Sequence, residues 1–124
     1  MSHFTKLDRA QITSPEAFKK AAKELGFTEI KENAEMRGFM GNRQKADVVA
    51  SRPGCAYDVG IVKAGSKYDL ISDWWGVRQT IDNPEDAFVR LTTKHTIVDT
   101  YRRQGFMAQV KTDIHNNITV TLTR

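Results

Sequence analysis

The stretch Tyr57–Gly76, with the sequence YDVGIVKAGSKYDLISDWWG, decides the fold of this chain. Apolar and polar residues alternate on both sides of Ala64-Gly65-Ser66, which predicts a β-hairpin with one buried face and a short glycine-containing turn. The hairpin ends on both tryptophans of the chain. Because successive strand side chains point to opposite faces of a sheet, we expect Trp74 to be buried and Trp75 to emerge on the other face with Asp73.

Length and composition indicate one ordinary domain spanning residues 1–124. The chain has 124 residues, of which 40% are hydrophobic and 27% charged, values that favour neither disorder nor a membrane protein. No apolar run approaches the roughly 20 residues that span a bilayer. The first residues lack the pattern of a signal peptide, and the lone Cys55 cannot form an internal disulfide. We therefore expect a cytoplasmic protein with no membrane association.

Helix signals appear twice. Ser14, Pro15 and Glu16 predict a helix start, and the helix should end at Gly26. A second helix is expected to begin at Asn83-Pro84 and to end at Gly105. The apolar stripes that should face the core are Phe18, Ala21, Ala22 and Leu25 in the first helix, and Phe88, Leu91, Val98 and Tyr101 in the second.

Strand signals fill most of the remaining chain. A first strand is expected from His3 to Ile12, with a slip in the two-residue period near Asp8. Two or three strands are expected in residues 27–52, with breaks at Asn33 and at Gly41-Asn42, and two more near residues 106–110 and 118–122. The pattern predicts an α+β fold, a two-layer sandwich of two helices on one mostly antiparallel sheet. The similar starts and ends of the helices also suggest duplicated β-α-β halves, although such signals are common to most helices.

The sequence shows no constellation typical of an enzyme. His3, His95 and His115 are scattered, and no serine or cysteine lies in a recognisable nucleophile elbow. His95 and Asp99 have the i, i+4 spacing of a helical metal pair, but a partly buried histidine bonded to a neighbour explains the spacing better. Residues 38–42 lack the lysine and hydroxyl of a phosphate loop. We expect no catalysis, no cofactor and no metal.

Three carboxylates near the hairpin form the remaining candidate for acid–base chemistry. Asp58, Asp69 and Asp73 should share one sheet face if the strands pair as expected, and paired carboxylates with separated pKa values can act as acid and base. The neighbouring cations Lys63, Lys67 and Arg78 favour solvated ion pairs instead.

Nucleic-acid binding is the alternative function. The net charge is +4, from 19 basic and 15 acidic residues that are interspersed along the chain. Phe39 would stack on bases and the basic residues near it would contact phosphate, while Trp75 with Arg78 would extend that surface. The basic residues near Phe39 are Arg37, Arg43, Lys45 and Arg52. Three glutamates in the same region, Glu29, Glu32 and Glu35, would oppose phosphate.

A protein-interaction surface is the favoured reading. Tryptophan and arginine are common anchors of protein interfaces. The candidate partner-binding residues are Arg37, Arg43, Asp73, Trp75 and Arg78. The sequence leaves open whether the chain also forms homo-oligomers.

The whole chain also resembles a family of small proteins of unknown function, a conserved open reading frame of algal plastids and cyanobacteria that also occurs in other bacteria and some phages. The resemblance is carried by Met1–Thr5, Glu32–Gly38 followed by Gly41, Lys45–Asp47, Tyr57–Gly60 and Asp73–Gly76. It implies no activity, cofactor or catalytic residue. Bacterial members are often encoded near AAA-type ATPases, so the resemblance implies an accessory subunit of a larger assembly.

Overall fold

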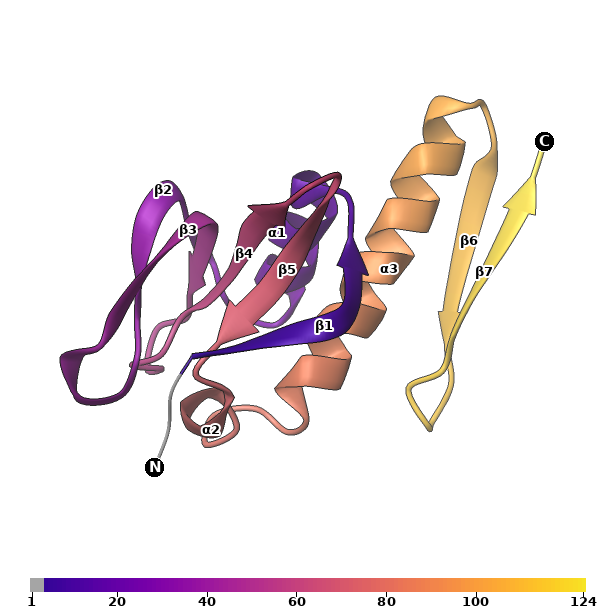
Figure 1. The fold of residues 1–124 in the computed structure, drawn as a ribbon. Helices are drawn as coiled ribbons and strands as arrows, with labels where there is room; N and C mark the ends of the chain where they lie inside the picture. The colour runs from indigo at the N-terminus through magenta and orange to yellow at the C-terminus, as the bar shows by residue number, and fades with distance from the viewer. Residues whose placement is uncertain (1–3) are drawn as a thin grey trace.

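The predicted hairpin lies inside a five-stranded sheet in the computed structural model of the chain, which describes residues 4–124 without the side chains of residues 8–11 (Figure 1). Its strands are β4 (Val59–Ala64) and β5 (Lys67–Ser72). Ala64 pairs with Lys67, so Gly65 and Ser66 form a two-residue turn. The prediction of a short glycine-containing turn is confirmed.

Three more strands complete this sheet: β1 (Thr5–Ile12), β2 (Glu29–Arg37) and β3 (Arg43–Ser51). The order across the sheet is β1-β5-β4-β3-β2, and every pair is antiparallel. The pairing of β1 with β5 shifts register between Leu7 and Ile12, which confirms the slip expected near Asp8. The expected first residue of this strand, His3, lies outside the described part of the chain.

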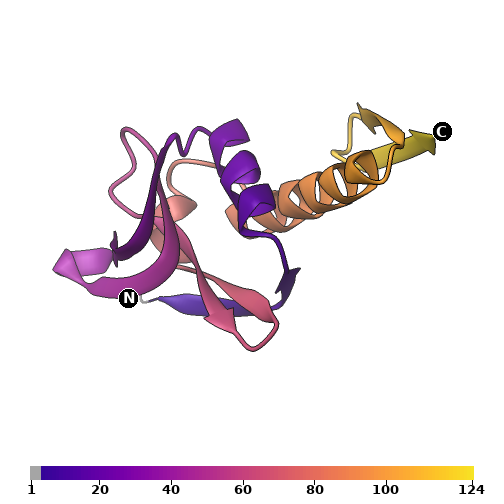
Figure 2. The same cartoon turned by 90° about the horizontal axis from the view of Figure 1, so that it is seen from above.

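Two helices cover one face of the sheet, as Figure 2 shows: α1 (Pro15–Glu24) and α3 (Pro84–Arg103). Ser14 caps α1 as predicted, since its Oγ accepts a hydrogen bond from the backbone N of Ala17 at 3.1 Å. Gly26, with a φ of 85°, lies just beyond the end of the helix.

The main core lies between these helices and the sheet. The ring of Phe88 from α3 lies 5.8 Å from that of Phe18 and 5.3 Å from that of Phe27. All three are fully buried, together with Val59, Ile61 and Leu70 of the hairpin. This face of the hairpin is the buried one that the alternation predicted.

A smaller apolar cluster lies on the opposite face of the sheet. Its buried members are Met36, Ala46, Val49 and Ile71. Beside it is an open hollow of about 670 Å³, lined both by apolar residues such as Phe4 and Val62 and by charged residues such as Lys6 and Asp69.

α3 extends past the sheet and carries a separate two-stranded sheet at its far end (Figures 1 and 2). The two strands are β6 (Met107–Thr112) and β7 (Ile118–Thr123). We call residues 97–123 the arm. The α+β class is confirmed, but the C-terminal strands form their own sheet instead of joining the first one.

Duplicated halves do not describe this topology. α1 connects β1 to β2, which are the two opposite edges of the large sheet. α3 instead leads from the end of the sheet into the arm. The two helices share start and stop signals because most helices do.

Both tryptophans lie in the short helix α2 (Trp74–Val77) and not in a strand, because β5 already ends at Ser72. The expected outcome holds, since Trp74 is buried and Trp75 is 50% exposed. The stated reason is wrong: consecutive helix positions differ by about 100° in direction, and this separates the two rings. The indole N–H of Trp74 donates to the carbonyl of Thr5 at 3.2 Å and joins α2 to β1.

Asn33 does not end a strand. β2 continues through it, and the pairs Glu32–Val48 and Ala34–Ala46 keep one register. Asn33 has a positive φ of 50°, so the backbone irregularity is real although the break is not. The second expected break is confirmed by the 3₁₀ turn η1 (Phe39–Gly41) between β2 and β3.

Candidate partner-binding site

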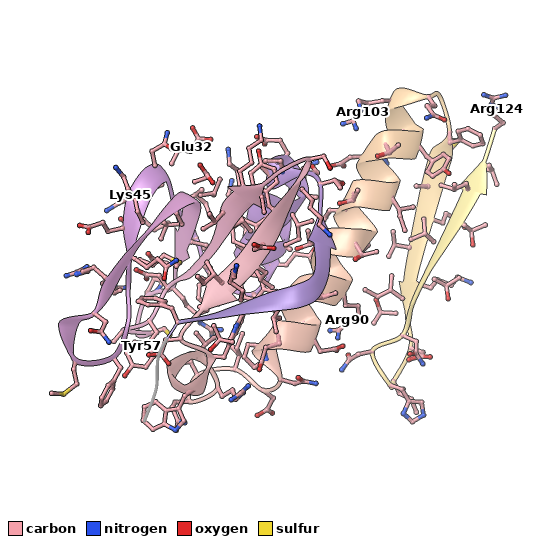
Figure 3. All side chains as sticks on the ribbon, in the orientation of Figure 1. Glu32, Lys45, Tyr57, Arg90, Arg103 and Arg124 are labelled. Atoms are coloured by element: carbon pink, nitrogen blue, oxygen red, sulfur yellow. The ribbon has the colours of Figure 1, made fainter. Side chains whose placement is uncertain are left out.

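An exposed aromatic surface forms where α2 meets the turn η1. The ring of Trp75 lies 6.2 Å from that of Phe39, edge to face, and 6.5 Å from that of Tyr57. Met40 adjoins Phe39 at the tip of the turn and is 84% exposed. Figure 3 labels Tyr57 at this end of the molecule, close to α2. We call Phe39, Met40, Tyr57 and Trp75 the Trp75 surface.

The turn that carries Phe39 and Met40 is held in a defined shape. Met40 adopts a left-handed conformation with a φ of 54°, which costs a non-glycine residue some strain. Two backbone bonds close the turn, from Gly38 N to Asn42 O at 2.9 Å and from Asn42 N to Phe39 O at 3.0 Å. Met40 is therefore displayed on a closed turn and not on a loose loop.

Asp73 connects this turn to α2. Its Oδ2 accepts a hydrogen bond from the backbone N of Phe39 at 3.1 Å, and its carbonyl accepts one from Gly76 N at 3.1 Å. Asp73 is only 1% exposed, so the expectation that it emerges beside Trp75 is wrong. The carboxylate is turned inward because it holds the backbone of η1, and Asp73 positions the Trp75 surface without being part of it.

Tyr57 packs directly on the backbone of α2. A methyl group on Gly76 would lie 1.1 Å from the Cδ2 atom of the Tyr57 ring, so only glycine permits this contact. The aromatic ring and the helix that carries Trp75 are thereby placed in direct contact.

Arg37 and Asp58 form the ion pair behind the surface. The guanidinium Nη2 lies 2.8 Å from Oδ1 of Asp58, and Nε lies 3.1 Å from Oδ2. The backbone N of Arg37 also donates to Oδ2 at 2.8 Å, and Nη2 reaches the carbonyl of Cys55. Hydrogen bonding to Asp58 raises the pKa of Arg37 above its ordinary value, although burial opposes this. Arg37 is thus a fixed cation with part of its side chain in solvent.

The other two predicted arginines differ in their surroundings. Arg78 follows α2 and forms an ion pair with Glu85 at the start of α3, while half of its side chain remains exposed. Arg43 is exposed at the beginning of β3, opposite Arg37 in the sheet register. Of the five predicted site residues, Trp75 belongs to the exposed surface, Asp73 supports it from inside, and the three arginines lie on the elements around it.

Each of the three carboxylates proposed for acid–base chemistry has a different partner. Asp58 is bound by Arg37, Asp73 by the backbone of Phe39, and Asp69 lies 3.7 Å from Lys6 across the sheet. Among the residues that the structure describes, Asp58 and Asp69 form their ion pairs with Arg37 and Lys6 and not with Lys63, Lys67 or Arg78, which corrects that expectation.

The helical histidine also has a different neighbour from the expected one. His95 pairs with Glu24 of α1, whereas Asp99 pairs with Lys20 at 2.7 Å. His115 lies in the exposed turn of the arm, and His3 lies outside the described residues. In the part of the chain that the structure describes, no group of three or more His, Cys, Asp and Glu side chains is placed to hold a metal ion.

The basic residues considered for nucleic-acid binding do not form one free surface. Arg37 is engaged by Asp58, and Arg52 donates to the carbonyl of Leu25 at 2.8 Å. Lys45 lies opposite Glu35 in the sheet register, next to a negative charge. Figure 3 shows Lys45 near Glu32 and away from Tyr57. Cations and aromatic rings are therefore only partly interleaved.

Sequence reasoning missed Met40 and Tyr57 as parts of the surface. Met40 carries no sequence signal beyond its place between Gly38 and Gly41. Tyr57 has a stronger one, since a bulky ring two residues before a strand and a glycine after two tryptophans are consistent with ring-on-backbone packing. That packing joins positions 19 residues apart, which no local pattern reveals.

The fold and the site define a small α+β protein with an exposed aromatic surface beside the ion pair of Arg37 and Asp58. The chain belongs to the family described as a protein of unknown function (DUF1257), whose model matches residues 21–122. Comparison with curated proteins and with solved structures gives no match. None of the described helices is both long enough and apolar enough to cross a membrane.

Proposed function

We propose that this chain is a small accessory or adaptor protein that binds a protein partner in a larger assembly through the Trp75 surface and performs no catalysis of its own. The observation that carries the proposal is the half-exposed indole of Trp75 beside the exposed Met40, both on short elements fixed by buried polar contacts. A rigid aromatic anchor loses little conformational entropy on binding, which makes it an efficient contact.

The surroundings of the surface support a protein partner. Tryptophan, tyrosine and arginine are the residues most often found as energetic hot spots, especially where polar groups exclude water around them. Arg37, Arg43 and Arg78 lie at the ends of the elements that carry this aromatic centre. A partner that presents an apolar side chain flanked by acidic residues would complement the Trp75 surface and these arginines.

The wider setting belongs to the same proposal. The resemblance to a plastid and cyanobacterial open-reading-frame family, with bacterial members encoded near AAA-type ATPases, points to an accessory subunit of such an ATPase in the cytoplasm. The partner would then be a protein of that assembly.

Nucleic-acid binding is the alternative that the same experiments address. Its support is the net charge of +4 and the exposed Arg43 and Lys45. The engagement of Arg37 and Arg52 by protein groups favours the protein partner over it. The alternative predicts affinity that falls steeply with salt, with a logarithmic slope of about 0.7 to 0.9 per phosphate contacted.

Affinity purification from the native cell under gentle conditions, followed by mass spectrometry, tests the proposal. Four forms are compared: wild type, Trp75→Ala, Met40→Ala and Met107→Ala. Met107 is 72% exposed on the arm, so it is the matched control for Met40. We expect wild type and Met107→Ala to retain the same partner, and the other two variants to lose it.

Two results would contradict this function. Recovery of the wild-type protein without any partner would contradict the proposal. Equal recovery of the partner with all four forms would show that the partner binds another surface. A shift of single-stranded or duplex probes at low salt that Trp75→Ala abolishes would support the nucleic-acid alternative instead. Thermal melts of each variant establish that the fold is intact.

A further inference from the structure

The exposed large hydrophobic side chains that the structure describes lie in two places. Met40 and Trp75 belong to the Trp75 surface, and the others all lie on the arm. They are Ile97, Tyr101, Met107, Val110 and Ile114. The arm is thus a second candidate for an interface, independent of the proposed function.

β7 is one of the two edge strands of the small sheet and is open to pairing. Among the described residues it pairs only with β6, and in Figure 1 it is the outermost strand, on the far side of β6 from the body. Its sequence, ITVTLT, alternates apolar residues with threonine and contains no charge, proline or glycine. Natural edge strands usually carry such protective features, because an unprotected edge is a template for another strand.

The turn of the arm shows which backbone groups of β7 face outward. Asp113 N donates to Asn117 O at 3.0 Å, so this pair is a hydrogen-bonded one. Hydrogen-bonded and non-hydrogen-bonded pairs alternate along an antiparallel ladder. Thr119 and Thr121, opposite Lys111 and Gln109, therefore bond to β6. The N–H and C=O groups of Ile118, Val120 and Leu122 point to the free edge.

We propose that β7 pairs with β7 of a second copy of this chain, antiparallel about a two-fold axis at Val120. In this register Val120 faces Val120 of the second copy, and Ile118 faces its Leu122. All outward N–H and C=O groups of these residues then exchange hydrogen bonds, and the apolar side chains of both copies stay on one face. A shift by one residue would place the threonines opposite the apolar residues and misalign the bonds.

The pattern of β7 favours a second copy as the occupant, because the strand is complementary to itself about Val120. The chain carries a net charge of +4, so two copies meet most readily at a strand without charge. β7 has no charge, whereas β6 carries Lys111. In the proposed register Thr119 lies opposite Thr121 of the second copy, a favourable cross-strand pair. One short strand pair is smaller than a standard interface, so we expect a dissociation constant on the order of 10 µM.

Sedimentation equilibrium of the full chain gives the first test. We expect the mass to rise from 14.1 kDa toward twice that value between about 1 µM and 1 mM. A mass that stays at that of the monomer up to 1 mM would overturn the proposal, and would leave β7 open to a strand of another protein.

A matched pair of double variants tests the register. In Thr119→Glu/Thr121→Glu, glutamates from the two copies lie opposite each other, whereas in Thr119→Glu/Thr121→Lys each glutamate faces a lysine. Residue 119 is the same in both, so its contact with Lys111 on β6 is unchanged. We expect the Glu/Lys form to dimerise at least about tenfold more tightly than the Glu/Glu form. Equal dimerisation of the two would overturn the proposed register.

Amide hydrogen exchange by NMR needs no variant and decides the case if either double variant fails to fold. In a dilute sample the amides of Ile118, Val120 and Leu122 should exchange rapidly, while those of Thr119 and Thr121 are protected by β6. At high concentration the first three should become protected as well. Unchanged rapid exchange of the Val120 amide across this range would overturn the proposal.

Discussion

At the scale of single residues, the contact of Tyr57 with Gly76 determines where Trp75 points. Replacing Gly76 with alanine would place a methyl group 1.1 Å from the Tyr57 ring, so the ring or the helix must move. We expect a loss of about 1–3 kcal/mol in unfolding free energy, as in other overpacked sites. We also expect a shift in tryptophan emission. Chemical denaturation followed by fluorescence measures both.

A double-variant cycle provides the control for this prediction. If the ring is what the new methyl group strikes, Tyr57→Ala should remove most of the additional cost of Gly76→Ala. Strict additivity of the two substitutions would show that the contact is not the cause.

The buried carboxylate of Asp58 is a second residue with a measurable effect. Asp58→Asn should lower the unfolding free energy by about 2–3 kcal/mol, because charged hydrogen bonds from Arg37 are weakened at a buried site. Asp69→Asn is the matched control, since its ion pair with Lys6 is long at 3.7 Å and the lysine is mostly exposed, and we expect a loss below about 1 kcal/mol. Urea denaturation measures the unfolding free energy of both variants, and equal losses in the two would contradict this prediction.

At the scale of elements, ion pairs join α1 to α3. Glu24 binds Lys94, at 2.6 Å, and His95, and Lys20 binds Asp99 at 2.7 Å. Burial raises the pKa of Glu24, but the hydrogen bonds from Lys94 and His95 outweigh it, so the pKa lies below its ordinary value of 4.5. The charged form of Glu24 is therefore favoured in the folded protein.

This shift makes the stability depend on pH in an acidic window. A carboxyl group whose pKa is lower in the folded state contributes stability above its unfolded pKa and loses it as the pH falls through the folded value. We expect stability to fall below about pH 4.5, and the Glu24→Gln variant to show a smaller fall. Thermal melts from pH 3 to 7 measure this, and parallel curves for the two proteins would contradict it.

The elements themselves were largely readable from local signals. Ser14, Pro15 and Gly26 marked α1 because capping depends on neighbouring residues alone. The helix at Trp74 was not readable, since the alternation of β5 runs into it without a break. α2 forms where Asp73 turns inward to bind the backbone of η1, a contact between residues 34 positions apart. Local patterns cannot report such a contact.

At the scale of the whole molecule, stability should be uneven. The large sheet is covered by two helices, whereas β6 and β7 pack mainly on α3, and the arm keeps much of its apolar surface exposed. In dilute solution we expect amides of β6 and β7 to exchange faster than those of β3, β4 and β5. Hydrogen exchange with peptide-level readout checks this order, and equal protection of both sheets would contradict it.

The separate sheet of the arm was beyond sequence reasoning because it depends on the direction of α3. α3 has 20 residues and spans about 30 Å, and its far end extends past the large sheet (Figure 2). The next strands therefore begin away from the large sheet and pair with each other. The patterns of β6 and β7 resemble those of the other strands, and so could not show which sheet they enter.

The placement of β1 and β2 at opposite edges of the sheet bears on how the chain is made. β1 leaves the ribosome first, but its partner β5 follows several seconds later at typical synthesis rates of about 5–20 residues per second. β2, β3, β4 and β5 are consecutive neighbours and can pair as they emerge. Of the strands in the large sheet, the first to emerge is thus the last to be paired, and until then its backbone hydrogen-bonding groups lack their partner strand.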